Sequence, residues 1–406
     1  MKTKTFLILF TLFFSLTVTA AAQRKKKPVR KSPPAAPAAR GTPIPNQELD
    51  FTKLLNALQT TEGQVAVSRA EQIKFIVETI KLGTVTFPLS PDREGELRKA
   101  GATDDLIAAI RKANSDSALA LRKKGDAHRA KEEYDAAIAA YTDAMEYKTA
   151  DADIYYSRGV AYYYKGDYDS AIIDLGKTIR DKPNDAEAYK YRGLAYHKTR
   201  AYDMARADYA KVLGIEPDNA EAYNNRGLTY AAQGQCDLAI REYVVALEKN
   251  VDFAEAYNNR GLCYNEKGKR GEAIAEFTKA IGLKDGYAEA WFNRGTAHFL
   301  KDELSEALED YNKAIALDPK YAEAYNARGE YYYKKGKDKT ALMEYTRAIN
   351  FNPKLAEALS NRGVIYLKEG RYREAVSDFE TAASIKPAIK DLQDNLEKAR
   401  KKAGKN

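Results

Sequence analysis

The sequence predicts an all-α protein, an α-solenoid of eight helix–turn–helix repeats behind a small N-terminal helical domain. Residues 220–230 (AEAYNNRGLTY) and residues 254–264 (AEAYNNRGLCY) differ only where Thr229 is replaced by Cys263. The offset of 34 residues recurs, since a glycine and an alanine return at this spacing: Gly125, Gly159, Gly193, Gly227, Gly261, Gly295, Gly329, Gly363 and Ala137, Ala171, Ala205, Ala239, Ala273, Ala307, Ala341, Ala375. Self-similarity at a fixed period is typical of a stack of one supersecondary unit.

The repeats begin at residues 118, 152, 186, 220, 254, 288, 322 and 356, and the array ends near residue 389. Counted within a repeat, positions 4, 8 and 11 share one face of a first helix because their spacing is i, i+4, i+7. We expect the two helices to cross closely at the glycine of position 8 and the alanine of position 20. The polar residues 390–406 predict a C-terminal capping helix and tail.

This pattern resembles the tetratricopeptide repeat, a helix–turn–helix unit of 34 residues. Position 4 is aromatic in six repeats, and position 24 is Tyr or Phe in all but one, which has Leu175. Proline stands at position 32 in five repeats, and Thr149, Val251 and Asp285 replace it in the others. The resemblance implies a right-handed superhelix whose concave groove binds a protein or peptide.

The N-terminus has the layout of an export signal at residues 1–22. Lys2 and Lys4 precede an apolar run that reaches Val18, and small alanines follow. The run is shorter than the ~20 apolar residues of a membrane-spanning helix. We therefore expect an exported protein, periplasmic or secreted. An uncleaved anchor is the alternative, because the basic residues 24–31 favour the cytoplasmic side.

The net charge of +8 is concentrated at the N-terminus, where residues 1–45 hold nine Lys and Arg and no acid. Taking these nine charges from the total leaves −1 for the rest of the chain, so we expect no nucleic-acid partner. Residues 23–46 are rich in Pro, Ala and charge, which predicts an extended linker. The alternative is a basic arm that holds the protein to an anionic surface of the cell envelope.

Residues 47–114 predict a small helical domain without repeats. Ser68 and Glu71 form a capping box ahead of an apolar-periodic segment, and Thr103 is placed to cap residues 105–113. Residues 84–87 are too short to predict more than an extended connection. Residues 96–113 resemble a small helical module found ahead of repeat arrays in exported bacterial proteins, which carries no known chemistry.

Nothing in the sequence predicts an enzyme. His128 and His298 stand at position 11, where other repeats have Tyr, so we expect them to be packing residues; His197 is the third histidine. No metal-ligand cluster, phosphate-binding loop or nucleophile–base pair occurs at a motif spacing. We therefore expect no catalytic residues, no metal site and no cofactor.

A recurring arginine at position 7 admits two interpretations. It is present in repeats 2–8, and the same seven repeats have an acid at position 23, whereas repeat 1 has Lys124 and Ala140. In a hairpin that turns near position 15, these positions lie at equal height. We predict ion pairs within each repeat, and the alternative is a row of arginines for phosphate ligands.

The inner face of the first helices is the predicted binding surface. An asparagine amide carries both a donor and an acceptor, so asparagines at equal spacing can hold successive groups of a peptide backbone. A similar row at position 6 lines the groove of O-linked N-acetylglucosamine transferase. The predicted peptide-binding residues are Asn225, Asn259, Asn293, Leu194, Leu228 and Leu262, the leucines forming an exposed apolar strip at position 9. Alternatively, each asparagine bonds within its own helix or to water.

The charge at position 2 predicts which partner is preferred. Chaperone-binding relatives need Lys there to clamp an acidic C-terminus, and this chain has Glu221, Glu255 and Glu289. A neutral or basic partner segment is therefore expected. The alternative is that these acids only oppose the helix dipole.

Cys236 and Cys263 are the only cysteines, at position 17 of repeat 4 and position 10 of repeat 5. On adjacent antiparallel helices these positions lie at similar height. A disulfide is permitted in an oxidising compartment, and the alternative is two buried thiols.

Overall fold

The computed structural model describes residues 48–59, 68–82, 84–148, 151–387 and 390–404. The predicted signal segment (residues 1–22) and linker (residues 23–46) lie outside them. Two compact units can be distinguished, one ending at Ile215 and one beginning at Glu216. The described residues hold twenty helices and two short strands.

The first unit begins with a small domain of α1 (Phe51–Gln59), α2 (Arg69–Leu82), α3 (Pro91–Lys99) and the start of α4 (Asp104–Ala130). Strand β1 (Glu48–Leu49) pairs in parallel with β2 (Thr84–Val85). The predicted capping box is confirmed, since the Ser68 amide donates to Glu71 Oε2 at 2.9 Å. The Thr103 hydroxyl caps α4 by accepting from the Leu106 amide at 3.4 Å.

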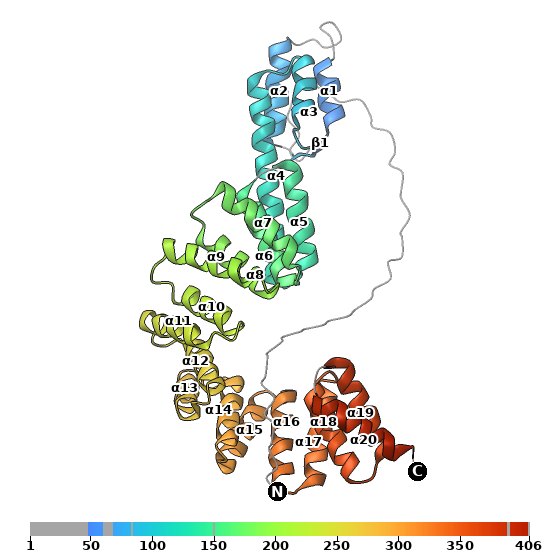
Figure 1. The fold of residues 1–406 in the computed structure, drawn as a ribbon. Coiled ribbons are helices and arrows are strands. Elements are labelled where there is room, and N and C mark those ends of the chain that lie inside the picture. Colours follow the sequence, from blue (N-terminus) through green and yellow to red (C-terminus); the bar gives the residue numbers. More distant parts are fainter. Residues whose placement is uncertain (1–47, 60–67, 83, 149–150, 388–389, 405–406) are drawn as a thin grey trace. The chain divides into compact units, whose positions relative to one another are not determined.

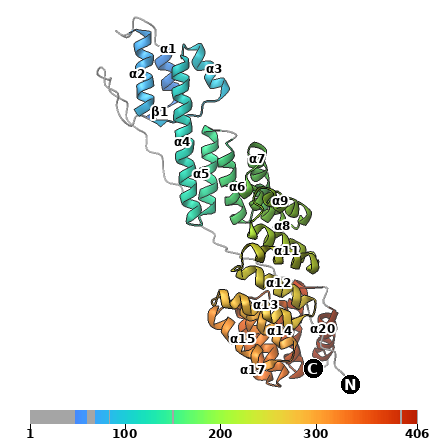
Figure 2. The same ribbon diagram turned by 90° about the vertical axis from the view of Figure 1, so that its left-hand side faces the viewer.

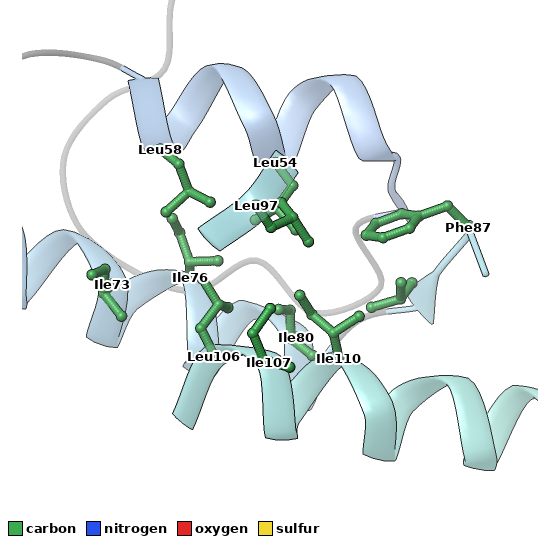
Figure 3. Close-up of a cluster of buried hydrophobic side chains, with 11 residues drawn as sticks. Leu54, Leu58, Ile73, Ile76, Ile80, Phe87, Leu97, Leu106, Ile107 and Ile110 are labelled. Carbon is green, nitrogen blue, oxygen red and sulfur yellow. The ribbon is translucent and has the colours of Figure 1, made fainter. Parts of the chain in front are cut away.

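A single apolar cluster holds this domain together, and side chains from α1, α2, α3 and α4 converge on it (Figure 3). Leu54, Leu97, Leu106 and Ile110 are fully buried there. The buried Asn114 closes the edge of the cluster, accepting from the Leu89 amide at 2.8 Å and donating to the Phe87 carbonyl at 3.1 Å.

Helix α4 joins the small domain to the first repeat without a break. It packs against α2 near its start and against α5 (Tyr134–Tyr147) further along (Figure 2). The predicted boundary between residues 114 and 118 lies inside this helix, because residues 104–124 contain no proline or glycine to end it.

Each repeat is a pair of packed helices, which confirms the predicted α-solenoid (Figure 1). The first unit continues with α6 (Ala152–Lys165), α7 (Tyr168–Asp181), α8 (Ala186–Lys198) and α9 (Tyr202–Ile215). The second unit contains α10 (Ala220–Ala231), α11 (Cys236–Lys249), α12 (Ala254–Glu266), α13 (Arg270–Leu283), α14 (Ala288–Leu300), α15 (Leu304–Leu317), α16 (Ala322–Lys334), α17 (Asp338–Phe351), α18 (Ala356–Lys368), α19 (Tyr372–Ile385) and α20 (Lys390–Ala403). Within each unit, the second helix of a repeat also packs on the next first helix.

The predicted close crossing within a repeat is confirmed at position 8. A Cβ on Gly261 would lie 2.7 Å from Cε1 of the fully buried Phe277, at position 24 of the same repeat. The predicted turn near position 15 is also confirmed, because that residue has a positive φ in all eight repeats. Five of them have glycine there, and the other three have Glu132, Arg200 and Asp302.

Candidate functional site

The seven arginines of position 7 all bind the acid of position 23 in their own repeat. The pairs are Arg158–Asp174, Arg192–Asp208, Arg226–Glu242, Arg260–Glu276, Arg294–Asp310, Arg328–Glu344 and Arg362–Asp378, at 2.6–2.8 Å. Their side chains are at most 23% exposed. The prediction of ion pairs is therefore confirmed, and these guanidinium groups are already engaged by carboxylates.

The histidines lie apart from one another in the sequence and bind ordinary neighbours. His128 Nδ1 lies 2.6 Å from Glu133 Oε2, and His298 Nδ1 lies 2.7 Å from Glu303 Oε2. The ring of His197 packs edge-on against Tyr202. In the described ranges, no three His, Cys, Asp or Glu side chains are grouped so that they could hold a metal ion.

Three asparagines of position 6 in the second unit, Asn259, Asn293 and Asn361, form a ladder, defined here as the row of side-chain hydrogen bonds that join neighbouring first helices. Asn259 Nδ2 donates to Asn224 Oδ1 at 2.9 Å, and Asn293 Nδ2 donates to Asn258 Oδ1 at 2.9 Å. Asn361 repeats this geometry with Asn326 at 3.1 Å. Each hydrogen bond reaches from position 6 back to position 5 of the preceding repeat, a pairing that was not predicted from the sequence.

The ladder leaves acceptors uncommitted. Within the described residues, Oδ1 of Asn259 and Oδ1 of Asn293 accept no hydrogen bond, although their Nδ2 atoms are bonded. Asn225 differs, because its Nδ2 is buried without a partner in the described part of the chain. In the sequence, the preceding repeat has Lys190 at position 5, which offers no amide oxygen. Asn225 therefore ends the ladder with an unused donor.

Two carboxyl groups lie beside the ladder, and burial raises the pKa of both. Glu289 Oε1 lies 3.4 Å from Asn258 Nδ2. Glu330 Oε1 accepts from Asn326 Nδ2 at 2.8 Å and from Asn361 Nδ2 at 3.1 Å. Glu330 was not predicted as a site residue, although an acid at position 9, between Thr296 and Val364 in the neighbouring repeats, was a visible signal in the sequence.

The leucines of position 9 are half-buried, which corrects the expectation of an exposed apolar strip. Leu228 packs against the cluster around Cys236 and Tyr243, and Leu262 packs against Ala273 and Phe277. These contacts bury apolar surface of each leucine against the second helix of its own repeat, so only part of each side chain remains for a partner. Leu194, also half-buried, belongs to the first unit. The part of these leucines in peptide binding stays a prediction.

The first unit carries a tyrosine cluster that was not predicted from the sequence. Tyr164 is 49% exposed, and its hydroxyl lies 3.2 Å from that of Tyr191. The ring of Tyr163 packs against both, and Tyr156 packs edge-on against Tyr191. The run of three tyrosines at residues 162–164 was the signal in the sequence.

Comparison with known proteins places these repeats in context. Family models described as TPR repeat or tetratricopeptide repeat match residues 125–166, 156–222, 224–288, 295–336, 329–370 and 356–388. No curated protein matches the chain. Among the helices of the described residues, none is long and apolar enough to cross a lipid bilayer.

The solved structures that resemble this chain in fold include the following two. The crystal structure of the APC/C hetero-tetramer Cut9–Hcn1 is 16% identical with a TM-score of 0.52, over 86% of this chain and 67% of the other. A tetratricopeptide repeat protein from Parabacteroides merdae is 21% identical with a TM-score of 0.52, over 61% of this chain and 98% of the other. At these identities the likeness shows the fold alone.

Proposed function

We propose that this chain, which belongs to the tetratricopeptide repeat family, is a non-enzymatic scaffold. Its ligand is an extended peptide segment of a partner. Proteins of this family bind protein or peptide partners in general. The segment runs along the first helices of repeats 4–6 and is held by Asn225, Asn259 and Asn293. Leu228 and Leu262 contribute their exposed parts, whereas Leu194 belongs to repeat 3 in the first unit and its role stays a prediction from the sequence.

The observation that supports this proposal is the orientation of the amides in the ladder. Because the Nδ2 bonds to Asn224 and Asn258 fix both carboxamides, no side-chain rotation has to be frozen when a partner binds. The uncommitted Oδ1 atoms of Asn259 and Asn293 can accept N–H groups of a peptide backbone. The Nδ2 atom of Asn225 is buried in the structure, so the part of Asn225 in holding the segment rests on its position in the sequence.

The charges beside the ladder favour a neutral or basic partner. Glu289 is partly withdrawn from water, so a cationic or N–H group of a partner would stabilise its ionised form. Glu255 is bound to Lys284 at 3.0 Å, which leaves little net charge at that place. A partner that presents an acidic C-terminus would meet no lysine clamp at position 2.

The second candidate function is a tether, in which the basic residues 24–45 hold the protein to an anionic envelope surface and the repeats are passive. The observation that favours it is the charge distribution, with nine basic residues and no acid in residues 1–45. Both functions assume export, and we expect removal of residues 1–22. N-terminal sequencing of protein from cell fractions tests this, since a soluble cytoplasmic protein that still begins at Met1 would contradict it.

Deleting residues 24–45 separates the two functions. The deleted and full-length proteins are compared for binding to peptides from a random-sequence display library and to vesicles of anionic phospholipid. The scaffold predicts that peptide binding is unchanged by the deletion. If the deletion removes vesicle binding and no peptide is selected by either protein, the tether is the better account.

A further inference from the structure

The two cysteines lie against each other at the boundary between repeats 4 and 5. Cys236 begins α11 and Cys263 lies on α12, and their Sγ atoms are 2.8 Å apart. The side chains are 5% and 2% exposed. The expected similar height on neighbouring helices is thus confirmed, and no disulfide bond joins the two cysteines in the structure.

The surroundings of the pair suppress the thiolate form. Burial raises the pKa of Cys263 to about 11 and raises that of Cys236 further, and Glu266 Oε2, 3.1 Å from Cys236 Sγ, adds to the second effect. The thiolate is the reactive form of cysteine. In the folded protein, the pair is therefore both shielded from oxidants and slow to react.

We propose that Cys236 and Cys263 are a disulfide site that is oxidised while the chain folds or when this boundary opens, and that the bond then locks α11 to α12. A thiolate of one cysteine attacks a small-molecule disulfide, forms a mixed disulfide and releases one thiol. The second cysteine displaces the other thiol. In sum, two protein S–H groups lose their protons, one S–S bond forms, and the small disulfide is reduced to two thiols, which takes up both electrons.

The cross-link spans the boundary that the ladder also crosses. The bond from Asn259 to Asn224 joins α12 to α10, and the disulfide joins α12 to α11, so both helices of repeat 4 are held to repeat 5. The two cysteines are 27 residues apart, and closing such a loop restricts the unfolded chain. Since the thiols already lie in contact, the native helices need little movement. The proposal rests on neither peptide binding nor export.

The test is refolding in the presence of a defined oxidant. Purified full-length protein is unfolded in urea and refolded in a buffer of reduced and oxidised glutathione, or with excess reductant. It is then alkylated in denaturant and weighed by intact mass spectrometry. We expect two alkyl groups on the reduced sample. On the oxidised sample we expect no alkyl group and a mass about 2 Da below that of the unalkylated reduced chain, because two hydrogens are lost. A non-reducing gel should show a monomer.

Thermal melting of the two samples tests whether the bond fits the native fold. We expect the oxidised sample to melt about 5–10 °C higher than the reduced one. Cys263→Ala is the matched control, because four other repeats have alanine at this position (Ala127, Ala161, Ala195, Ala297), and its melting should not depend on the redox buffer. Two alkyl groups, glutathione adducts or a disulfide-linked dimer after refolding in the glutathione buffer would overturn the proposal. Equal or lower melting of the oxidised sample would also overturn it.

Discussion

Arg260 donates from both Nε and Nη2 to the same carboxylate oxygen of Glu276, at 2.9 and 2.7 Å. The two side chains are 13% and 10% exposed, and the guanidinium also lies over the ring of Tyr257. A charge withdrawn from water is stable only with its partner, so the pair fixes the spacing of the two helices of repeat 5.

We expect Arg260→Ala to lower the free energy of unfolding by about 3–5 kcal/mol, because it leaves the carboxylate of Glu276 buried and unpaired. Chemical denaturation measures this. The matched control is Lys124→Ala in repeat 1, where Ala140 stands at the acid position, with a change of about 0.5 kcal/mol or less. The double substitution Arg260→Met with Glu276→Leu should cost less than the sum of the losses of Arg260→Met and Glu276→Leu measured singly. A loss equal to that sum would contradict the ion-pair account.

Gly261→Ala should destabilise the protein by about 1–3 kcal/mol, because its new Cβ would lie 2.7 Å from Cε1 of the fully buried Phe277. Gly271→Ala in α13 is the control, since a Cβ there meets no atom within 4 Å. Alanine favours a helix over glycine, so we expect this variant to gain up to about 1 kcal/mol. Equal melting of the two variants would show that the crossing can relax.

Glu132→Gly should stabilise the first repeat. Glu132 has φ of 60° at the turn of position 15, a conformation that costs a residue with a Cβ about 1–2 kcal/mol and costs glycine little. The control is Lys131→Gly at the neighbouring residue, whose φ is −96°. It should destabilise the repeat because glycine raises the conformational entropy of the unfolded chain. Hydrogen exchange of the amides in α4 and α5 reports both changes, and the same sign for both would refute the argument.

Glu330→Gln should stabilise the protein at pH 7 and have little effect at pH 4. Burial raises the pKa of Glu330 above its ordinary 4.5, and the nearby Glu357 adds to this, so the folded state holds the proton more tightly than the unfolded state. The folded state is therefore destabilised as the pH rises through the raised pKa of Glu330. Glutamine does not ionise, so it removes this loss, and its side-chain oxygen can still accept the hydrogen bonds from Asn326 and Asn361. Urea denaturation from pH 4 to pH 8 measures the difference, which should grow with pH; a constant difference would contradict the assignment.

The sequence predicted the features that recur from repeat to repeat. The 34-residue period predicted the helix pairs and their close crossing at the glycine of position 8. The ion pairs were predicted because repeat 1 lacks both the arginine and the acid. Each of these depends on contacts within one helix pair, for which spacing along the chain and the turn at position 15 suffice.

The sequence did not predict the partner of each asparagine. Asn224 and Asn259 meet because of the rotation between successive repeats, and this angle cannot be obtained from the periodicity of one helix. The continuity of α4 was missed because the repeat pattern suggested a boundary where no residue ends the helix. The pairing of β1 with β2 involves two residues in each strand, too few for a pattern.

The most direct test of the scaffold is the affinity of the triple variant Asn225→Ala, Asn259→Ala, Asn293→Ala for a peptide selected by the wild-type protein from a random-sequence library. Isothermal titration should show a loss of about tenfold or more, the equivalent of about 1.4 kcal/mol, because each lost hydrogen bond contributes about 0.5–1.5 kcal/mol. Asn361→Ala also removes a bond of the ladder but lies outside repeats 4–6, so it should bind as wild type does. Unchanged affinity of a folded triple variant would contradict the account and assign the asparagines to packing between repeats.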